Sequence, residues 1–104
     1  MREYRDYQGL RIRLTDERFA HILDHPEMMD MEGRIADTLL RPEQVVESLS
    51  DVEARLYYRF YLGTRVGDKY LSVVVKVQAA DAFVVTAYLT DKVKKGKLLW
   101  PIEK

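Results

Sequence analysis

The chain has 104 residues, of which 47% are hydrophobic and 33% charged, and its 17 basic and 17 acidic side chains give zero net charge. These values are typical of one globular domain and exclude a disordered or fibrous chain. The absence of cysteine excludes disulfides, thiolate metal sites and cysteine nucleophiles. No apolar run approaches the ~20 residues of a membrane-spanning helix, and the first ten residues lack the pattern of a secretion signal, so we expect a cytoplasmic protein without a membrane partner.

The zero net charge conceals an uneven distribution along the chain. Residues 1–55 carry eight basic and thirteen acidic side chains, a balance of −5, and residues 56–104 carry nine and four, a balance of +5. Such a dipole could guide an anionic ligand to one end of the molecule, or the two halves could simply neutralise each other.

The first half of the chain predicts one short strand and three helices. Residues 10–15 alternate like a strand, and Thr15 then suits the N-cap of a helix that stops by His25, because Pro26 disfavours the α conformation in the residue before it. A second helix is predicted to begin at Pro26, and a third, shorter one at Pro42. Their predicted apolar stripes are Met28, Met31, Ile35 and Leu39 in the second, and Val45, Val46 and Leu49 in the third.

The second half predicts three strands at residues 56–62, 70–78 and 83–90, because the hydrophobic period changes to two. Gly67-Asp68 and residues 79–82 are suitable hairpin turns between them. Each strand has an apolar and a mixed face, as a half-solvated antiparallel sheet requires. The predicted fold is therefore α+β, with N-terminal helices packed on one face of an antiparallel meander.

The mixed faces of these strands predict an outward surface of cations, hydroxyls and aromatic rings. It suits a phosphodiester flanked by bases, since cations attract phosphate and rings stack on bases. The same side chains could also serve the sheet alone, because Tyr and Thr are good strand formers and exposed Lys or Arg prevents edge association. The predicted members are Arg59, Lys76, Thr86, Tyr88 and Thr90, framed by Tyr57 and Tyr61.

A lysine-rich tail follows the last of these strands. Lys92, Lys94, Lys95 and Lys97 lie close together in the sequence. Clustered lysines can hold a nucleic-acid backbone without reading its sequence, or they can belong to a solvated turn around Gly96.

Both histidines of the chain lie on the first predicted helix. At 100° per residue, His21, His25 and Arg18 fall on one flank, turned away from the apolar side. They could face a cleft, or be ordinary surface residues, with His25 favoured by the helix dipole at a last turn. A metal clip would need a carboxylate as third ligand, and the residue after His21 is isoleucine where metalloproteases have glutamate.

Five segments resemble one family of nucleases. "LTDERFAHILDHPEM", "RPEQVVES", "LYYRFYL", "KYLSVVVKV" and "FVVTAYLTDKVKKG" are similar, in this order over residues 10–97, to the phage-associated branch of the barnase–EndoU–colicin–RelE superfamily. The most specific parts are the His-x-x-x-His-Pro-Glu segment and the Thr-Ala-Tyr of the last long strand. The resemblance implies a fold of N-terminal helices followed by an antiparallel sheet.

The resemblance also implies metal-independent RNA cleavage without a cofactor, in which a 2′-hydroxyl attacks its own phosphodiester. Histidine suits the proton transfers because its pKa of ~6.5 lies near working pH, and a cation suits the charged phosphorane. We therefore expect His21 and His25 as the acid–base pair, although Glu27 could be the base in a barnase-like scheme. Lys76 or Arg59 would stabilise the phosphorane, and Thr86 and Tyr88 would orient the phosphate. The expected RNA-binding residues are Arg18, Tyr57, Tyr61, Thr90, Lys92, Lys94 and Lys95.

Two hypotheses follow for the function. The first is a toxin-like or RNA-processing ribonuclease, with RNA as partner and an antitoxin or immunity protein as a further one. The second is a non-catalytic module that binds a protein or RNA through a tyrosine-rich sheet face.

Overall fold

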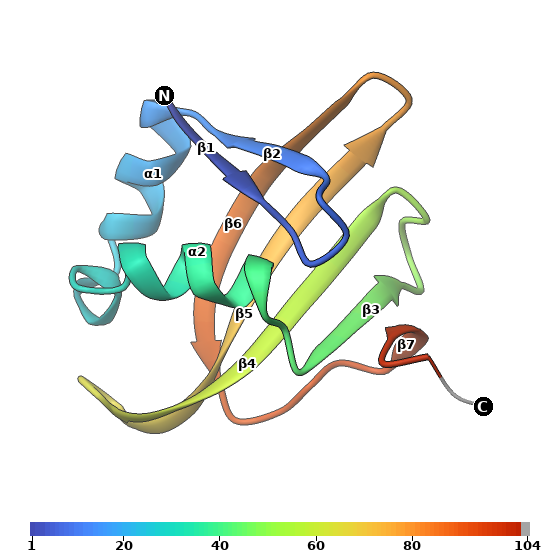
Figure 1. The fold of residues 1–104 in the computed structure, drawn as a ribbon. Helices are drawn as coiled ribbons and strands as arrows, with labels where there is room; N and C mark the ends of the chain where they lie inside the picture. Colours follow the sequence, from blue (N-terminus) through green and yellow to red (C-terminus); the bar gives the residue numbers. More distant parts are fainter. Residues whose placement is uncertain (103–104) are drawn as a thin grey trace.

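A computed structural model describes residues 1–102, which form one seven-stranded mixed sheet and two α-helices (Figure 1). The α+β prediction is thereby confirmed. In chain order the elements are β1 (Arg2–Arg5), β2 (Arg11–Leu14), α1 (Asp16–Leu23), the 3-10 turn η1 (Pro26–Met28), α2 (Glu32–Leu40), β3 (Gln44–Ser48), β4 (Ala54–Thr64), β5 (Gly67–Gln78), β6 (Asp81–Thr90) and β7 (Gly96–Trp100).

The strand order across the sheet is β1-β2-β6-β5-β4-β3-β7. The predicted meander is confirmed in its centre, where β4, β5 and β6 pair antiparallel as the alternation indicated. The sheet is not wholly antiparallel, because β2 pairs with β6 in parallel at Arg13 and Phe83. This parallel contact is possible because α1 and α2 separate the N-terminal hairpin from the later strands along the chain.

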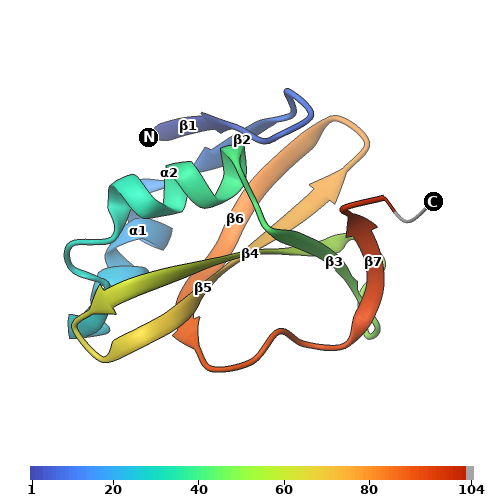
Figure 2. The ribbon, with the colours of Figure 1, turned by 60° about the horizontal axis from the view of Figure 1, so that its bottom comes forward.

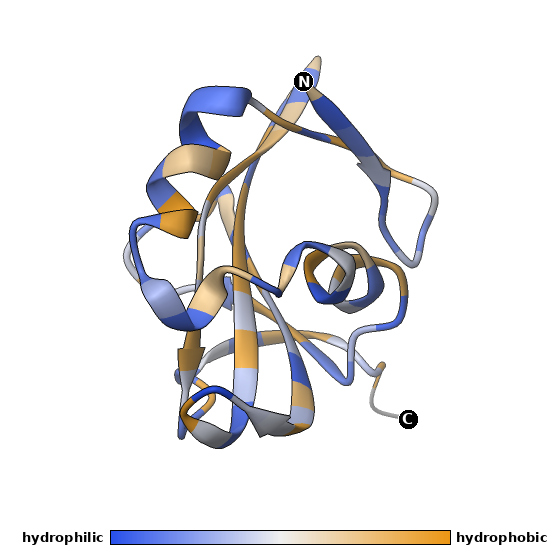
Figure 3. Ribbon diagram, turned by 90° about the vertical axis from the view of Figure 1, so that its left-hand side faces the viewer, coloured by the Kyte–Doolittle hydropathy of each residue, from blue (hydrophilic) through white to orange (hydrophobic). Residues whose placement is uncertain are grey.

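The main hydrophobic core lies between α2 and the sheet. α2 crosses one sheet face (Figures 1 and 2), and its buried Ile35 and Leu39 join the same cluster as the fully buried Val73 on β5. The strands carry hydrophobic and hydrophilic residues in alternation (Figure 3), so the side chains of one sheet face join this core and those of the other face point away from it. We call the sheet face opposite α2 the open face.

The helical region differs in part from the prediction. α1 begins as expected, with the Thr15 side chain accepting a hydrogen bond from the Arg18 backbone amide. It lies beside β6 (Figures 1 and 3), and its Ile22 enters the main core. The single helix predicted from Pro26 is instead divided into η1 and α2, although the predicted apolar side chains Met28 and Met31 are both buried.

The third predicted helix is wrong, because the residues after Pro42 form strand β3. Val45 joins the main core and Val46 joins a second cluster, so the two neighbours point to opposite faces, as a strand requires. Short apolar runs of this kind fit either structure by period, and the two β-branched residues favour the strand. Strands β1 and β7 were also not predicted.

A second, smaller cluster covers part of the open face. Val93, in the segment after β6, packs on it together with Val46, Leu56 and Tyr58. The following strand approaches β3 closely at Gly96, where a Cβ atom would lie less than 3.0 Å from both the Glu47 carbonyl and the Val46 side chain. Within residues 1–102, no helix is both long and apolar enough to cross a membrane.

Candidate nucleic-acid interface

Three neighbouring strands present hydroxyl and aromatic groups on the open face. Thr86, Tyr88 and Thr90 on β6 lie opposite Val74, Ser72 and Tyr70 on β5, respectively. Ser72 in turn lies opposite Tyr58 on β4, and both of these side chains are fully buried. All three β6 side chains are partly exposed, and the predicted grouping of Thr86, Tyr88 and Thr90 with Lys76 on one face is confirmed by this register.

The end of this face nearest the β4–β5 hairpin is apolar and accessible. Phe60 is 41% exposed and Leu62 is 70% exposed. The rings of Phe60 and Tyr70 meet edge to face, with their centroids 5.0 Å apart. Large apolar side chains grouped on a surface in this way mark a binding surface more often than isolated ones do.

The predicted outward placement of Tyr57, Arg59 and Tyr61 is wrong. Tyr57 lies opposite the core residue Val73, and Tyr57 itself is fully buried. Its hydroxyl donates to Oδ2 of the buried Asp6 at 2.7 Å, which gives the tyrosine a polar partner inside the protein. Burial, and then the bond to Asp6, raise the pKa of Tyr57.

Tyr61 likewise points toward α2 and packs against the main core. Its hydroxyl lies 3.0 Å from Thr38 Oγ1 and 3.2 Å from the Arg34 carbonyl, to which it can donate. Burial is the main cause of its raised pKa. The guanidinium of Arg34 lies over the Tyr61 ring, 4.9 Å from its centroid. Tyr57 and Tyr61 therefore belong to the core side of the sheet and not to an RNA-stacking surface.

The two predicted phosphorane cations lie on opposite faces of the sheet. Arg59 donates from Nη1 to the Arg41 carbonyl at 2.8 Å, and its Nε lies 3.8 Å from Asp37, so it fastens the end of α2 to β4. Lys76 is on the open face, but its Nζ lies 3.3 Å from Asp51. The pKa of Asp51 is lowered, mainly by a hydrogen bond from the Glu53 backbone and next by a hydrogen bond from Lys76.

Lys76 is also distant from the other end of the face along the strand. Tyr70, opposite Thr90, precedes it by six residues on β5, which corresponds to ~20 Å. Thr86, by contrast, lies opposite Val74, two residues from Lys76 on β5. Of the two alternative phosphorane cations, Arg59 therefore does not share a face with Thr86 and Tyr88, whereas Lys76 lies near Thr86 and far from Thr90.

Both histidines are exposed, but only His21 lies on α1; His25, predicted on the same helix, lies beyond its end and precedes η1 in an extended conformation. The His21 Nδ1 lies 3.8 Å from Asp24, and the His25 Nδ1 lies 3.7 Å from Glu27. Their side chains are 66% and 68% exposed, which confirms the prediction that they are turned away from the core, as is the exposed Arg18. Within the part of the chain that the structure describes, no hydrogen bond or ion pair joins either histidine to an open-face residue.

The lysines after β6 border the open face. We call residues 91–97 the lysine segment. Val93 anchors it to the second cluster, and the Lys94 backbone amide donates to the Tyr58 hydroxyl at 3.2 Å. The side chains of Lys92 and Lys95, like that of Lys94, are exposed beside this anchor. The predicted lysines thus lie next to the aromatic and hydroxyl groups.

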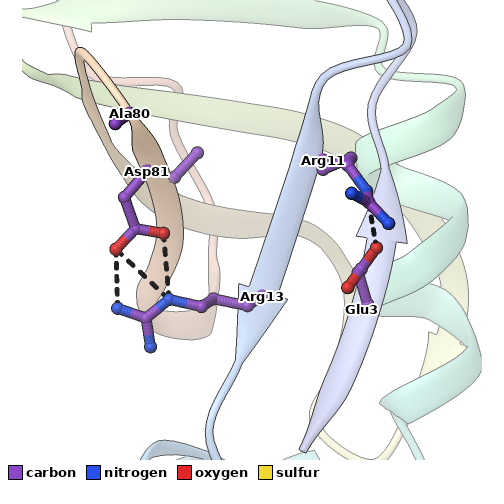
Figure 4. Close-up of a pocket in the computed structure, with 6 residues that line it drawn as sticks. Glu3, Arg11, Arg13, Ala80 and Asp81 are labelled. Atoms are coloured by element: carbon purple, nitrogen blue, oxygen red, sulfur yellow. Dashed lines mark hydrogen bonds and ion pairs between the residues drawn. The ribbon is translucent and has the colours of Figure 1, made fainter.

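Sequence reasoning missed a hollow between the N-terminal hairpin and the β5–β6 turn, of about 200 Å³ (Figure 4). Arg13 on its wall forms a two-pronged ion pair with Asp81, with Nη2 2.7 Å from Oδ2 and Nε 2.9 Å from Oδ1. Arg11 turns to Glu3, with 2.8 Å between Nε and Oε1. The alternating arginines of "RIRL" were the available signal, although nothing in the sequence showed that this strand would meet the β5–β6 turn.

No family model, curated protein or solved structure matches this chain. Among residues 1–102, no three His, Cys, Asp or Glu side chains are grouped so that they could hold a metal ion.

Proposed function

We propose that this protein binds single-stranded RNA across the open face. The observation that carries the proposal is that accessible aromatic and hydroxyl side chains of β4–β6 lie next to the exposed cations of the lysine segment. These accessible side chains are Phe60, Tyr70, Thr86, Tyr88 and Thr90. Exposed rings such as Phe60 provide stacking surfaces for bases, and lysines neutralise the phosphates between them. Hydroxyls such as those of Thr86 and Tyr88 can hydrogen-bond to phosphate or ribose oxygens.

The surface favours a single strand over a duplex. Stacking on a flat sheet requires bases that are free of their partners, whereas A-form duplexes are bound through backbone and 2′-hydroxyl contacts. Lysines bind phosphate as point charges and do not read base edges, so little sequence preference is expected.

We further propose that the bound RNA is cleaved, as the resemblance to the barnase–EndoU–colicin–RelE superfamily and its RelE-like fold implies. The supporting observation is that His21 and His25 are both exposed on the segment beside β6, each near a carboxylate. One imidazole would accept the 2′-hydroxyl proton as that oxygen bonds to phosphorus. The other would protonate the departing 5′-oxygen, leaving a 2′,3′-cyclic phosphate. We place this activity in the cytoplasm.

Binding is tested by fluorescence anisotropy with a labelled single-stranded RNA. Lys94→Ala should weaken binding and reduce the magnitude of the salt slope by about 0.7, the value for one lost phosphate contact on a single strand. The matched control is Arg41→Ala, which removes an exposed cation near the end of α2 and should leave the affinity unchanged. Equal losses in both variants would reject the open face as the RNA site.

Cleavage is tested separately, with RNA in the presence of a metal chelator and analysis of the product ends. His21→Ala and His25→Ala should each abolish the 2′,3′-cyclic product while RNA affinity is retained, because proton transfer and binding would use different residues. An intact cleavage rate in both variants, or the absence of cleavage by the parent protein, would reject the ribonuclease and leave an RNA-binding protein.

The second candidate function is protein binding through the same face. The exposed Leu62 favours it, because an aliphatic side chain that is 70% exposed gains from burial against a partner but offers no ring to stack on a base. Leu62→Ser should weaken a protein complex and leave RNA affinity unchanged.

A further inference from the structure

A like-charge pair lies beside the hollow between the β1–β2 hairpin and the β5–β6 turn. Arg5 on β1 is directly opposite Arg11 on β2. Cross-strand neighbours are about 5 Å apart at Cβ, and like charges in that arrangement destabilise a sheet. The pair nevertheless occupies an antiparallel ladder of only four residue pairs, where an oppositely charged pair would be more favourable.

The neighbouring acidic groups compensate this charge only in part. Glu3 pairs with Arg11, and Asp81 is occupied by Arg13. The Arg5 guanidinium donates to a neutral acceptor, the Gly9 carbonyl, at 2.9 Å. Three guanidinium groups therefore face two carboxylates along this wall, which leaves one positive charge.

The three arginines line one continuous depression. Arg11 borders both of the adjoining hollows, one of about 200 Å³ that also touches Arg13 and one of about 390 Å³ that also touches Arg5. The opposite wall carries Asp81, which Arg13 engages, between the small side chains of Ala80 and Ala82, and Gln78 and Ala79 extend it along the larger hollow. Figure 4 shows Arg13 reaching across to Asp81 while Arg11 turns toward Glu3, so each guanidinium keeps N–H groups that these carboxylates do not use.

We propose that this depression is a phosphate-binding site, built from Arg5, Arg11 and Arg13. A phosphate placed between Arg5 and Arg11 would convert their repulsion into two attractions, and arginine forks match its oxygens in pairs. Three guanidiniums that approach from two strands suit a tetrahedral anion, because a planar carboxylate has only two oxygens to share. The alanines of the opposite wall leave room for the group that carries the phosphate. This site is independent of the RNA surface proposed above.

The test is a titration of the full chain with inorganic phosphate, followed by backbone and arginine side-chain NMR. The Arg5, Arg11 and Ala80 signals should shift, and both Arg5→Gln and Arg11→Gln should weaken phosphate binding by about tenfold or more, as expected for a lost charge-assisted contact. Arg41→Gln is the matched control and should bind phosphate like the parent. Equal shifts with acetate, equal losses in the control, or no shift at these residues would overturn the proposal.

A second readout covers the case in which a variant folds poorly. In phosphate-free buffer Arg5→Gln should be at least as stable as the parent, because it removes the like-charge pair, whereas only the parent should gain thermal stability on adding phosphate.

A 5′-phosphorylated RNA oligonucleotide and its unphosphorylated counterpart then distinguish the two sources of the phosphate group, a nucleic-acid terminus and a free phosphorylated compound. Tighter binding of the phosphorylated RNA than of the unphosphorylated RNA, with the difference lost in Arg5→Gln, assigns a nucleic-acid terminus. Equal binding of the two RNAs by a protein whose arginine signals still shift with inorganic phosphate assigns a free phosphorylated compound. Since Lys94 lies outside the site, failure here leaves the RNA proposal standing.

Discussion

The bond between Tyr57 and Asp6 permits the sharpest test of the core, because Tyr57→Phe removes one oxygen and little else. Asp6 is 2% exposed, and its Oδ1 would keep the backbone amides of Gln8 and Leu10, each at 2.9 Å. Its Oδ2 would lose the hydroxyl at 2.7 Å. Loss of a hydrogen bond to a buried charged group costs about 1.5–3 kcal/mol of unfolding free energy.

The assay is urea unfolding followed by tryptophan fluorescence. Tyr70→Phe is the matched control, since the Tyr70 hydroxyl has no hydrogen-bond partner within residues 1–102 and its loss should cost under ~0.5 kcal/mol. A cycle with Asp6→Ala should show coupling of about 1 kcal/mol or more between the two side chains. If Tyr57→Phe and Tyr70→Phe behave alike, the buried bond does not contribute as argued.

The same bond has a pH signature at alkaline pH. Because burial and Asp6 raise the pKa of Tyr57, the folded protein keeps a proton that the unfolded chain releases. This contribution is fully present below the ordinary tyrosine pKa of ~10 and declines as the pH rises above it. The parent should therefore lose stability above pH ~10 more steeply than Tyr57→Phe does, and parallel pH profiles would contradict the assignment.

Three further outcomes are expected. Gly96→Ala should lower the melting temperature, because its Cβ has no room against β3, whereas Gly33→Ala, on a helix position with open space, should raise stability by up to ~1 kcal/mol; equal effects would contradict the close approach. The pKa of Asp81 is lowered, mainly by the hydrogen bond from Arg13. The ionised Asp81 therefore stabilises the fold above the ordinary aspartate pKa of ~4, and this stabilisation is lost as the pH falls. NMR titration should show that pKa rising in Arg13→Gln. Ser72→Ala should leave stability unchanged or slightly higher, because the buried Ser72 hydroxyl has no hydrogen-bond partner among residues 1–102; a loss above ~1 kcal/mol would reveal a partner.

Local patterns were sufficient where one periodicity decided the structure. Strand β5 follows from the alternation of Leu71, Val73 and Val75 with a mixed face, and the start of α1 follows from Thr15. Alternation predicts that β6 is a strand but not its inward face near Val84, because an irregularity in its register brings both Val84 and Ala87 into the core. The residues around Val45 and Val46 were ambiguous, because two adjacent apolar side chains fit either a buried helix or a strand with two covered faces. Here tertiary context decided the outcome, since both faces of β3 are covered.

The candidate site was predictable only to the level of single strands. Alternation correctly placed Thr86, Tyr88 and Thr90 on one face of their strand. It does not determine which β4 side chains lie on the same side of the sheet, because that depends on the pairing register between strands. Strand β1 was missed because its four residues, REYR, carry no apolar alternation, although it pairs with the adjacent β2. Strand β7 was missed because it pairs with β3, which is distant in the sequence. Trp100, for example, packs on Tyr7, with their ring centroids 5.0 Å apart.

The orientation of β4 is the point at which core and surface depend on each other. Hydrophobicity alone favours the wrong face, because Leu56, Phe60 and Leu62 on one face alternate with Arg55, Tyr57, Arg59 and Tyr61 on the other. Tyr57 and Tyr61 can be buried because Asp6 and Thr38 satisfy their hydroxyls. The same choice leaves Phe60 on the open face. If this strand were turned over, that ring would enter the core, and the Asp6 carboxylate and the Thr38 hydroxyl would each lose a tyrosine hydroxyl as partner. The aromatic surface proposed to bind RNA is therefore determined by hydrogen bonds on the opposite side of the sheet.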